Sequence, residues 1–141
     1  MKKKLMIIES YTFNSNSNLR IINEYAFRNC INLKEIQLPK SLKKIDFKKV
    51  FENCTEIKIE IEEENEYLTS NEGVLLNQNK SELIQYPIGN QRTSNTIPEE
   101  TERIRIKSLS NCYKLENIEV NENNQYFISI DEVLFDYDKT K

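Results

Sequence analysis

The chain has 141 residues, of which 38% are hydrophobic and 30% are charged, and its formal net charge is −3. That length is typical of one domain, and the regular recurrence of apolar residues argues against wholesale disorder. The sequence contains no His, which removes the commonest general base and the commonest metal ligand. Because the chain is mildly acidic and lacks a large basic field, nucleic-acid binding through phosphate neutralisation is disfavoured.

The N-terminal segment decides what can be said about export. A basic start is followed by an apolar run of only Leu5–Ile8, which Glu9 closes. A secretory signal needs roughly 7 to 15 apolar residues, and a membrane span needs about 18. The sequence therefore predicts neither a signal peptide nor a transmembrane segment, and it leaves a cytoplasmic location open.

A short motif recurs four times from residue 13 onward. It has an aromatic residue or Leu, a small polar residue three positions later, and then Leu or Ile at further steps of three. The small polar position holds Asn16, Cys30, Cys54 and Cys112. An odd number of cysteines, no C-x-x-C spacing and no His disfavour zinc binding, catalysis and a disulfide. We therefore expect these four residues to fill one structural slot of the repeat, with protected, unpaired thiols that donate weakly to a backbone carbonyl.

Each motif leads into a short segment in which apolar residues alternate with polar ones. Alternation with period two predicts a strand with one buried face. A repeat of about 24 residues cannot bury that face alone, so the coils must stack. The sequence predicts a solenoid, mainly β, with stacked parallel strands, short single-turn helices and inserted β-hairpins. The positions expected in its core are Leu33, Ile36, Leu38, Leu115, Ile118 and Val120.

A longer period is superimposed on the short one. The segment from Asn65 to Leu75 returns as the segment from Asn124 to Leu134. In the first unit, Val74–Leu76, a polar turn and Leu83–Ile84 predict a hairpin. No counterpart of Leu83–Ile84 follows the second copy. We therefore expect residues 1–141 to form a single domain of two long units of about 58–59 residues, the second truncated, from a longer array. The uncovered edge at Val133–Phe135 would favour self-association.

The pattern F-x-x-C-x-x-L-x-x-I-x-L-P-x-x-L-x-x-I at Phe27–Ile45 resembles the LRR_5-like repeats of the BspA-like leucine-rich repeat family. The segment Asn65–Leu75 also resembles the hairpin element of that family, although Glu132 replaces the turn glycine in the second copy. The resemblance implies a non-catalytic protein-interaction module of a surface antigen or adhesin that binds host or matrix protein, at the cell surface or outside the cell. An intracellular leucine-rich repeat scaffold is the alternative.

No catalytic, cofactor-binding or metal-binding residue is predicted. The segment Lys40–Lys49 carries a net +4 and Glu60–Glu66 carries −5. These runs lack the spacing of a calcium loop and the aromatic residues of a nucleic-acid surface, so we expect solvated faces. Partners should instead meet the outward row of the stacked strands, as in other repeat proteins. That row consists of Glu35, Gln37, Lys58, Glu60, Asn117 and Glu119.

Overall fold

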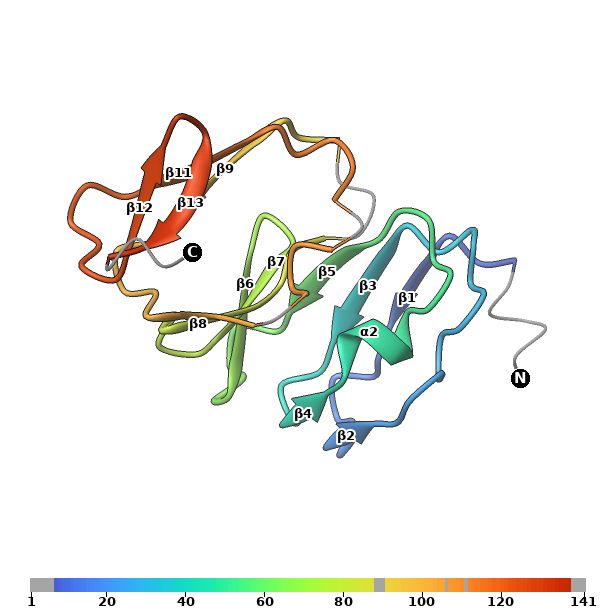
Figure 1. The fold of residues 1–141 in the computed structure, drawn as a ribbon. Coiled ribbons are helices and arrows are strands. Elements are labelled where there is room, and N and C mark those ends of the chain that lie inside the picture. The colour runs from blue at the N-terminus through green and yellow to red at the C-terminus, as the bar shows by residue number, and fades with distance from the viewer. Residues whose placement is uncertain (1–6, 88–90, 106, 111, 138–141) are drawn as a thin grey trace.

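The computed structural model describes residues 7–87, 91–105, 107–110 and 112–137, and for residues 47 and 48 the backbone only. Within these ranges the only helix is α2 (Phe47–Val50), one turn long, and the chain winds into a solenoid of about five turns (Figure 1). The strands are β1 (Ser10–Thr12), β2 (Ile21–Ile22), β3 (Glu35–Leu38), β4 (Lys44–Ile45), β5 (Lys58–Ile61), β6 (Leu68–Asn71), β7 (Val74–Asn77), β8 (Glu82–Gln85), β9 (Ser94–Ile97), β10 (Arg103–Ile104), β11 (Asn117–Val120), β12 (Phe127–Ile130) and β13 (Val133–Asp136).

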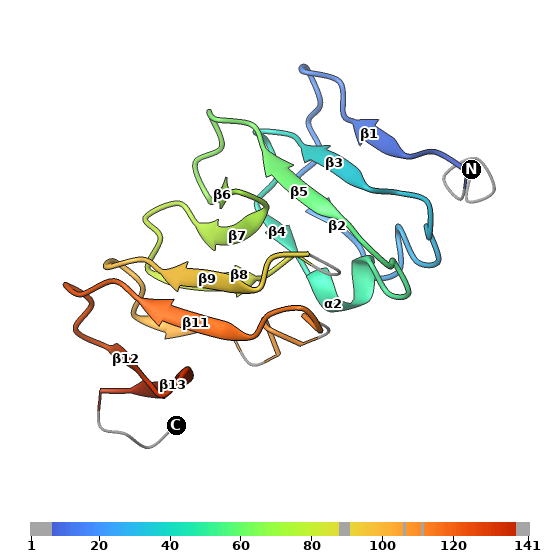
Figure 2. The same ribbon diagram turned by 90° about the horizontal axis from the view of Figure 1, so that it is seen from above.

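Parallel strands stack from coil to coil, as the alternating segments predict. The first ladder is β1-β3-β5, in which Tyr11 lies beside Ile36 and Ile36 beside Ile59. A shorter parallel ladder joins β2 to β4 on another side of the same coils. Figure 2 shows β1, β3 and β5 side by side, with β9 and β11 further along the same direction. The predicted leucine-rich repeat solenoid is confirmed.

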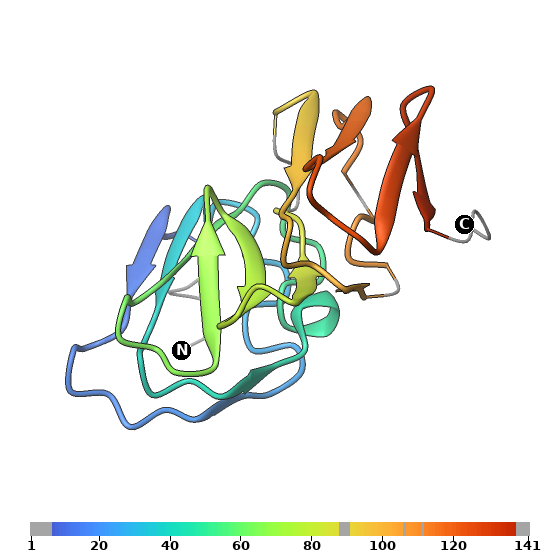
Figure 3. The same ribbon diagram turned by 90° about the vertical axis from the view of Figure 1, so that its left-hand side faces the viewer.

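The two long units have the same architecture. In the second unit the strands β9 and β11 occupy the places of β3 and β5, and they pair in parallel in the same way. A hairpin follows each pair: β6–β7 in the first unit and β12–β13 in the second. The predicted return strand β8 pairs with β7, and β10 joins β8 in parallel. Figure 3 shows β12 and β13 at the end of the molecule opposite to β1.

The core is complete in the first unit and thinner in the second. Leu33, Ile36 and Leu38 are fully buried, as predicted. Leu115, Ile118 and Val120 are only partly buried, so the prediction of a buried position was wrong for these three. The ladder β9-β11 has two strands where β1-β3-β5 has three, and Ile118 stacks on Asn95 of β9 where its equivalent Ile59 stacks on Ile36.

Aromatic side chains fill the N-terminal coils. The rings of Phe27 and Phe51 stack with centroids 5.5 Å apart and an interplanar angle of 18°. Phe13 meets Phe27 edge-on at 6.5 Å. Because Phe27 and Phe51 are buried, this stack extends the hydrophobic core from one coil to the next.

Candidate functional site

The structure brings four of the six predicted partner-binding residues together. Glu35 lies beside Lys58, and Gln37 beside Glu60, across the pair β3–β5. Three of these side chains are exposed and Glu60 is partly buried. The remaining two, Asn117 and Glu119, lie on β11, which belongs to a separate two-stranded ladder with β9. The predicted row is therefore divided into two patches.

Three residues of the first patch, Glu35, Gln37 and Glu60, line a groove of about 630 Å³. The strands β1, β3 and β5 form its floor, and β6 and the loop after β5 contribute the remaining lining. We call it the strand-face groove, and the residues that line it are Ser10, Tyr11, Thr12, Glu35, Gln37, Glu60, Ile61, Glu62, Glu63, Thr69 and Ser70. Its volume falls in the range of ordinary ligand sites, about 300–1,000 Å³.

Sequence reasoning missed the contribution of β1 and β6 to this groove. Ser10 and Thr12 lie on β1, which pairs in register with β3. The alternation of polar residues in this segment is a sequence signal that could have identified β1 as a further strand of the ladder. Ser70 lies on β6 and holds that strand against β5: the amide of Ile61 donates to Ser70 Oγ at 2.9 Å, and the hydroxyl donates to Glu60 Oε2 at 3.4 Å. The groove is therefore built from segments distant in sequence.

The groove is acidic. Four carboxylates line it, from Glu35, Glu60, Glu62 and Glu63. The ammonium of Lys58 lies 2.8 Å from Glu60 Oε1 and 3.7 Å from Glu35 Oε1. The hydrogen bond to Glu60 is the main cause that raises the pKa of Lys58. One lysine beside four carboxylates leaves a negative potential, which favours a partner that presents Lys or Arg.

The charged runs cross-link successive coils. Lys40 pairs with Glu64, Lys49 Nζ lies 2.6 Å from Glu24 Oε1, and the amide of Lys40 donates to Glu62 at 2.7 Å. These side chains are exposed, so solvent screens each pair and its contribution to stability is small. The runs are solvated faces that align neighbouring coils.

The structure agrees in part with the prediction that the thiols fill one slot of the repeat. Cys54 donates from Sγ to the carbonyl of Phe27 in the preceding coil, at 3.2 Å, and is buried. Cys30 is also buried, but its thiol donates at 4.0 Å to the carbonyl of Arg28, in its own coil. Cys112 is partly buried, and Asn16 is exposed and does not fill a buried slot, because no coil precedes its own among the described residues.

Burial makes the thiols poor nucleophiles. It raises the pKa of Cys54 and of Cys112 to about 11, and it also raises the pKa of Cys30. All three are free thiols. Because the thiolate is the reactive species, thiols with raised pKa values are almost fully protonated near neutral pH.

The residue before each cysteine has a backbone role that the sequence did not reveal. Asn29 and Asn53 adopt φ values of 63° and 61°, in the left-handed region that Asn tolerates better than most residues. Asn53 Nδ2 donates to Asn29 Oδ1 at 2.8 Å, so the two amides stack from coil to coil. Asn111, the third residue of this type, lies outside the described residues.

Two further features concern metals and membranes. Among the residues that the structure describes, no group of three His, Cys, Asp or Glu side chains is placed to hold a metal ion. Within the same ranges, no helix has the length and apolar character needed to cross a membrane.

Stacked parallel strands, a motif with steps of three and inserted hairpins define a leucine-rich repeat solenoid. The chain belongs to the family described as BspA type Leucine rich repeat region, whose sequence model matches six copies within residues 4–139. The resemblance stated from the sequence is thereby confirmed. Membership supports a protein-interaction repeat module.

Two solved structures are similar. The pneumococcal vaccine antigen PcpA is 35% identical over 80% of this chain and 28% of that chain, with a TM-score of 0.68. A leucine-rich repeat protein from Eubacterium ventriosum ATCC 27560 is 17% identical over 87% of this chain and 50% of that chain, with a TM-score of 0.47. No curated protein matches significantly. The chain thus spans less than a third of the pneumococcal antigen.

Proposed function

We propose that this chain is a non-catalytic module that binds a protein ligand through the strand-face groove. The observation that carries the proposal is an acidic groove of about 630 Å³, lined by outward side chains of three stacked strands and by β6. Repeat proteins commonly use such a face for partners because each coil adds one row of side chains. The groove favours a ligand segment that carries Lys or Arg.

The setting of this activity is a surface antigen or adhesin that binds host or matrix protein, at the cell surface or outside the cell. Two findings support it: the BspA-type family and the similarity to a pneumococcal vaccine antigen. The alternative is an intracellular leucine-rich repeat scaffold, which the three free thiols favour, because reducing compartments preserve thiols. Labelling of intact cells with a membrane-impermeant reagent separates the two settings.

Binding is tested with immobilised matrix proteins and a double variant, Glu35→Lys with Glu60→Lys. Reversing two charges in the groove should weaken binding at least tenfold. The matched control is Glu119→Lys on β11, an exposed glutamate of the second patch, which should bind as the unmodified chain does. Equal binding by all three proteins would contradict the proposal.

We also propose that the chain self-associates through β13. Val133 of β13 is 45% exposed, whereas its equivalent Val74, which β8 covers, is 6% exposed. Among the described residues β13 pairs with β12 alone. An apolar strand with one open edge is a template for another chain.

A further inference from the structure

The strand β9 has an open edge on the side that faces the hairpin β6–β7. Within the described part of the chain β9 pairs with β11 and with no other strand. Its equivalent in the first unit, β3, pairs on both sides, with β5 and with β1. By the offset that relates β3 to β9, the segment equivalent to β1 is β6, which pairs with β7 in antiparallel fashion and leaves this edge of β9 without a strand in the described part of the chain.

The backbone groups that point to this edge can be assigned. The carbonyls of Thr93 and Ile97 accept hydrogen bonds from the β11 side, from Asn117 and Asn121 at 2.9 and 3.0 Å. Backbone groups alternate in direction along a strand in a parallel sheet, so the N–H and C=O groups of Ser94 and Thr96 point away from β11. They point toward the hairpin.

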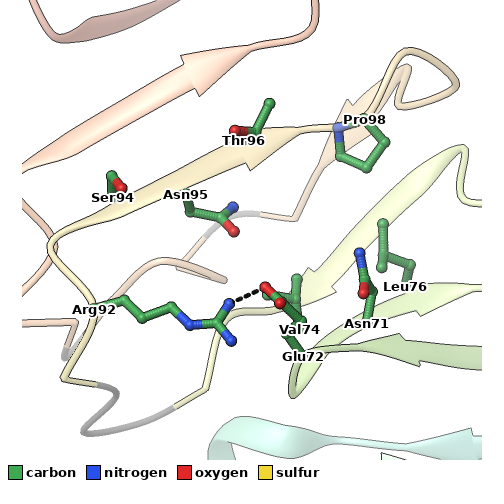
Figure 4. Close-up of a pocket in the computed structure, with 9 residues that line it drawn as sticks. All are labelled: Asn71, Glu72, Val74, Leu76, Arg92, Ser94, Asn95, Thr96 and Pro98. Carbon is green, nitrogen blue, oxygen red and sulfur yellow. Dashed lines mark hydrogen bonds and ion pairs between the residues drawn. The ribbon is translucent and has the colours of Figure 1, made fainter.

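A groove of about 410 Å³ lies along this edge (Figure 4). Figure 4 shows Asn95 and Thr96 on the side of β9, and Glu72, Val74 and Leu76 on the side of the hairpin. The residues that line it are Asn71, Glu72, Val74, Leu76, Arg92, Ser94, Asn95, Thr96 and Pro98. We call it the β9 groove. The ion pair between Glu72 and Arg92 joins its two sides.

The side chains of the β9 groove differ from those at the equivalent place in the first unit, where β3 has a strand on both sides. Asn95 occupies the position equivalent to Ile36, which is fully buried between β1 and β5. An inward-facing amide in place of an isoleucine provides a donor and an acceptor beside the open backbone edge. The site thus offers polar partners along β9, while the hairpin forms its other side with Val74 and Leu76, whose side chains are largely buried in the core.

We propose that the β9 groove binds an extended peptide segment of a partner protein, which adds to β9 as a parallel strand. The internal repeat supplies the template: β1 lies on β3 in parallel, with Ser10 beside Glu35 and Thr12 beside Gln37. A segment in the same register would lie beside Ser94 and Thr96. Main-chain hydrogen bonds provide affinity in this mode of recognition, and side chains at alternate positions provide selectivity.

The probe is a synthetic peptide with the sequence of residues 8–14, the segment that contains β1. The amide of Glu35 donates to the carbonyl of Glu9 at 3.2 Å, so the backbone groups of peptide residues 9 and 11 should face β9. N-methylation of the peptide at Tyr11 removes a donor that faces β9. The matched control carries the methyl group at Thr12, whose N–H faces away.

Titration of the full chain with each peptide is followed by NMR. We expect chemical-shift changes at the amides of Ser94 and Thr96, and binding at least tenfold weaker for the peptide methylated at Tyr11 than for the control. On the protein, Thr96→Pro removes the facing N–H and should abolish binding, while Thr96→Ala keeps the N–H and should retain it. The methylated peptides leave the protein unchanged, so the test holds even if Thr96→Pro fails to fold.

Three outcomes would overturn this proposal. The first is no shift at Ser94 or Thr96 with millimolar peptide, and the second is equal binding by both methylated peptides. The third is a dimer of the unliganded chain that Thr96→Pro abolishes, since a second copy would then occupy the groove. The double variant Glu35→Lys with Glu60→Lys should bind the peptide normally, which distinguishes this site from the strand-face groove.

Discussion

Asn65 and Asn124 make the same four hydrogen bonds at equivalent positions of the two long units. The amide nitrogen of Asn65 donates to the carbonyls of Pro39 and Leu42, at 3.2 and 2.9 Å. Its oxygen accepts from the amides of Tyr67 and Leu68, both at 2.8 Å. One buried side chain thus ties the start of β6 to the turn that follows β3.

Asn124 repeats this arrangement in the second unit. It donates to the carbonyls of Pro98 and Thr101 at 2.7 and 2.9 Å, and accepts from the amides of Tyr126 and Phe127 at 2.8 Å. Only the carboxamides of Asn and Gln combine two N–H donors with an oxygen that accepts two hydrogen bonds. The side chain of Gln is one carbon longer than that of Asn. Asn at this position therefore specifies where each hairpin leaves the solenoid.

Asn65→Ala should lower the free energy of unfolding by about 3 kcal/mol or more, because it leaves four backbone groups without their partner in a buried place. Asn124→Ala should cost less, since the second unit is less buried and water can replace the side chain. Chemical denaturation of both variants measures the difference. Equal costs, or a cost below about 1 kcal/mol for Asn65→Ala, would show that the amide is not the element that fixes the hairpin.

A second matched pair tests the unequal cores. Ile59 is fully buried, whereas its equivalent Ile118 is partly buried and lies beside Asn95. Ile59→Ala should therefore destabilise the chain by roughly 2–5 kcal/mol, and Ile118→Ala by about half as much. Thermal unfolding of the two variants under one set of conditions checks the order. A larger cost for Ile118→Ala is the result that contradicts the unequal burial.

A third prediction concerns the turns of the two hairpins. In the first turn Glu72 and Gly73 have φ values of 52° and 82°, and in the second Asp131 and Glu132 have 49° and 65°. Two-residue turns of this kind favour glycine at the second position. Glu132→Gly should therefore stabilise the second hairpin by about 1 kcal/mol, as measured by the melting temperature.

The matched control is Gly73→Ala. Its Cβ would lie 3.1 Å from Pro87 Cγ and 3.4 Å from Lys58 Cγ, in addition to the strained φ. It should lower stability by about 1–2 kcal/mol, in the direction opposite to Glu132→Gly. If both substitutions change the melting temperature in the same direction, the equivalence of the two turns is wrong.

The sequence predicted most of the fold but only part of the site. Alternating apolar residues such as Ile36 and Leu38 identify a strand and its buried face, because burial is a local property of a repeated pattern. The strand β6 was not predicted as such, since Thr69, Ser70 and Asn71 lack that pattern; β6 is held by its pairing with β7 and by the hydrogen bond from the amide of Ile61 to Ser70 Oγ. Both grooves depend on which coils become neighbours, and a local pattern does not specify this.

The raised pKa of the Cys54 thiol has a consequence for stability. Its ordinary pKa is 9.0, and burial raises it to about 11 in the folded chain. The unfolded chain therefore loses its proton first as the pH rises, so stability should be unchanged below about pH 9 and should fall between about pH 9 and 11. The loss from this one thiol amounts to about 2–3 kcal/mol. Urea denaturation from pH 7 to 11 measures it.

Cys54→Ala is the control for this pH dependence, and it should flatten the fall between pH 9 and 11. Cys30, Cys112 and Tyr86 also have raised pKa values, so a smaller fall should remain. An identical pH profile for Cys54→Ala and the unmodified chain would show that Cys54 is not responsible.

The last prediction concerns the open edge of β13. In the first unit β8 begins at Glu82 and covers β7, and the equivalent position of the second unit, by the offset that separates Asn65 from Asn124, is Lys141. Appending Leu-Ile-Gln-Tyr-Pro, the sequence of residues 83–87, directly after Lys141 therefore continues the second unit in register. The added strand should pair with β13, lower the exposure of Val133 and raise the melting temperature. Because it covers the edge, it should also suppress self-association of the chain, which light scattering over a range of concentrations measures.

The matched control appends Ser-Ser-Gln-Ser-Pro, which has the same length without the apolar side chains and should leave both association and stability unchanged. A chain that stays monomeric at every concentration without any extension would refute self-association through β13.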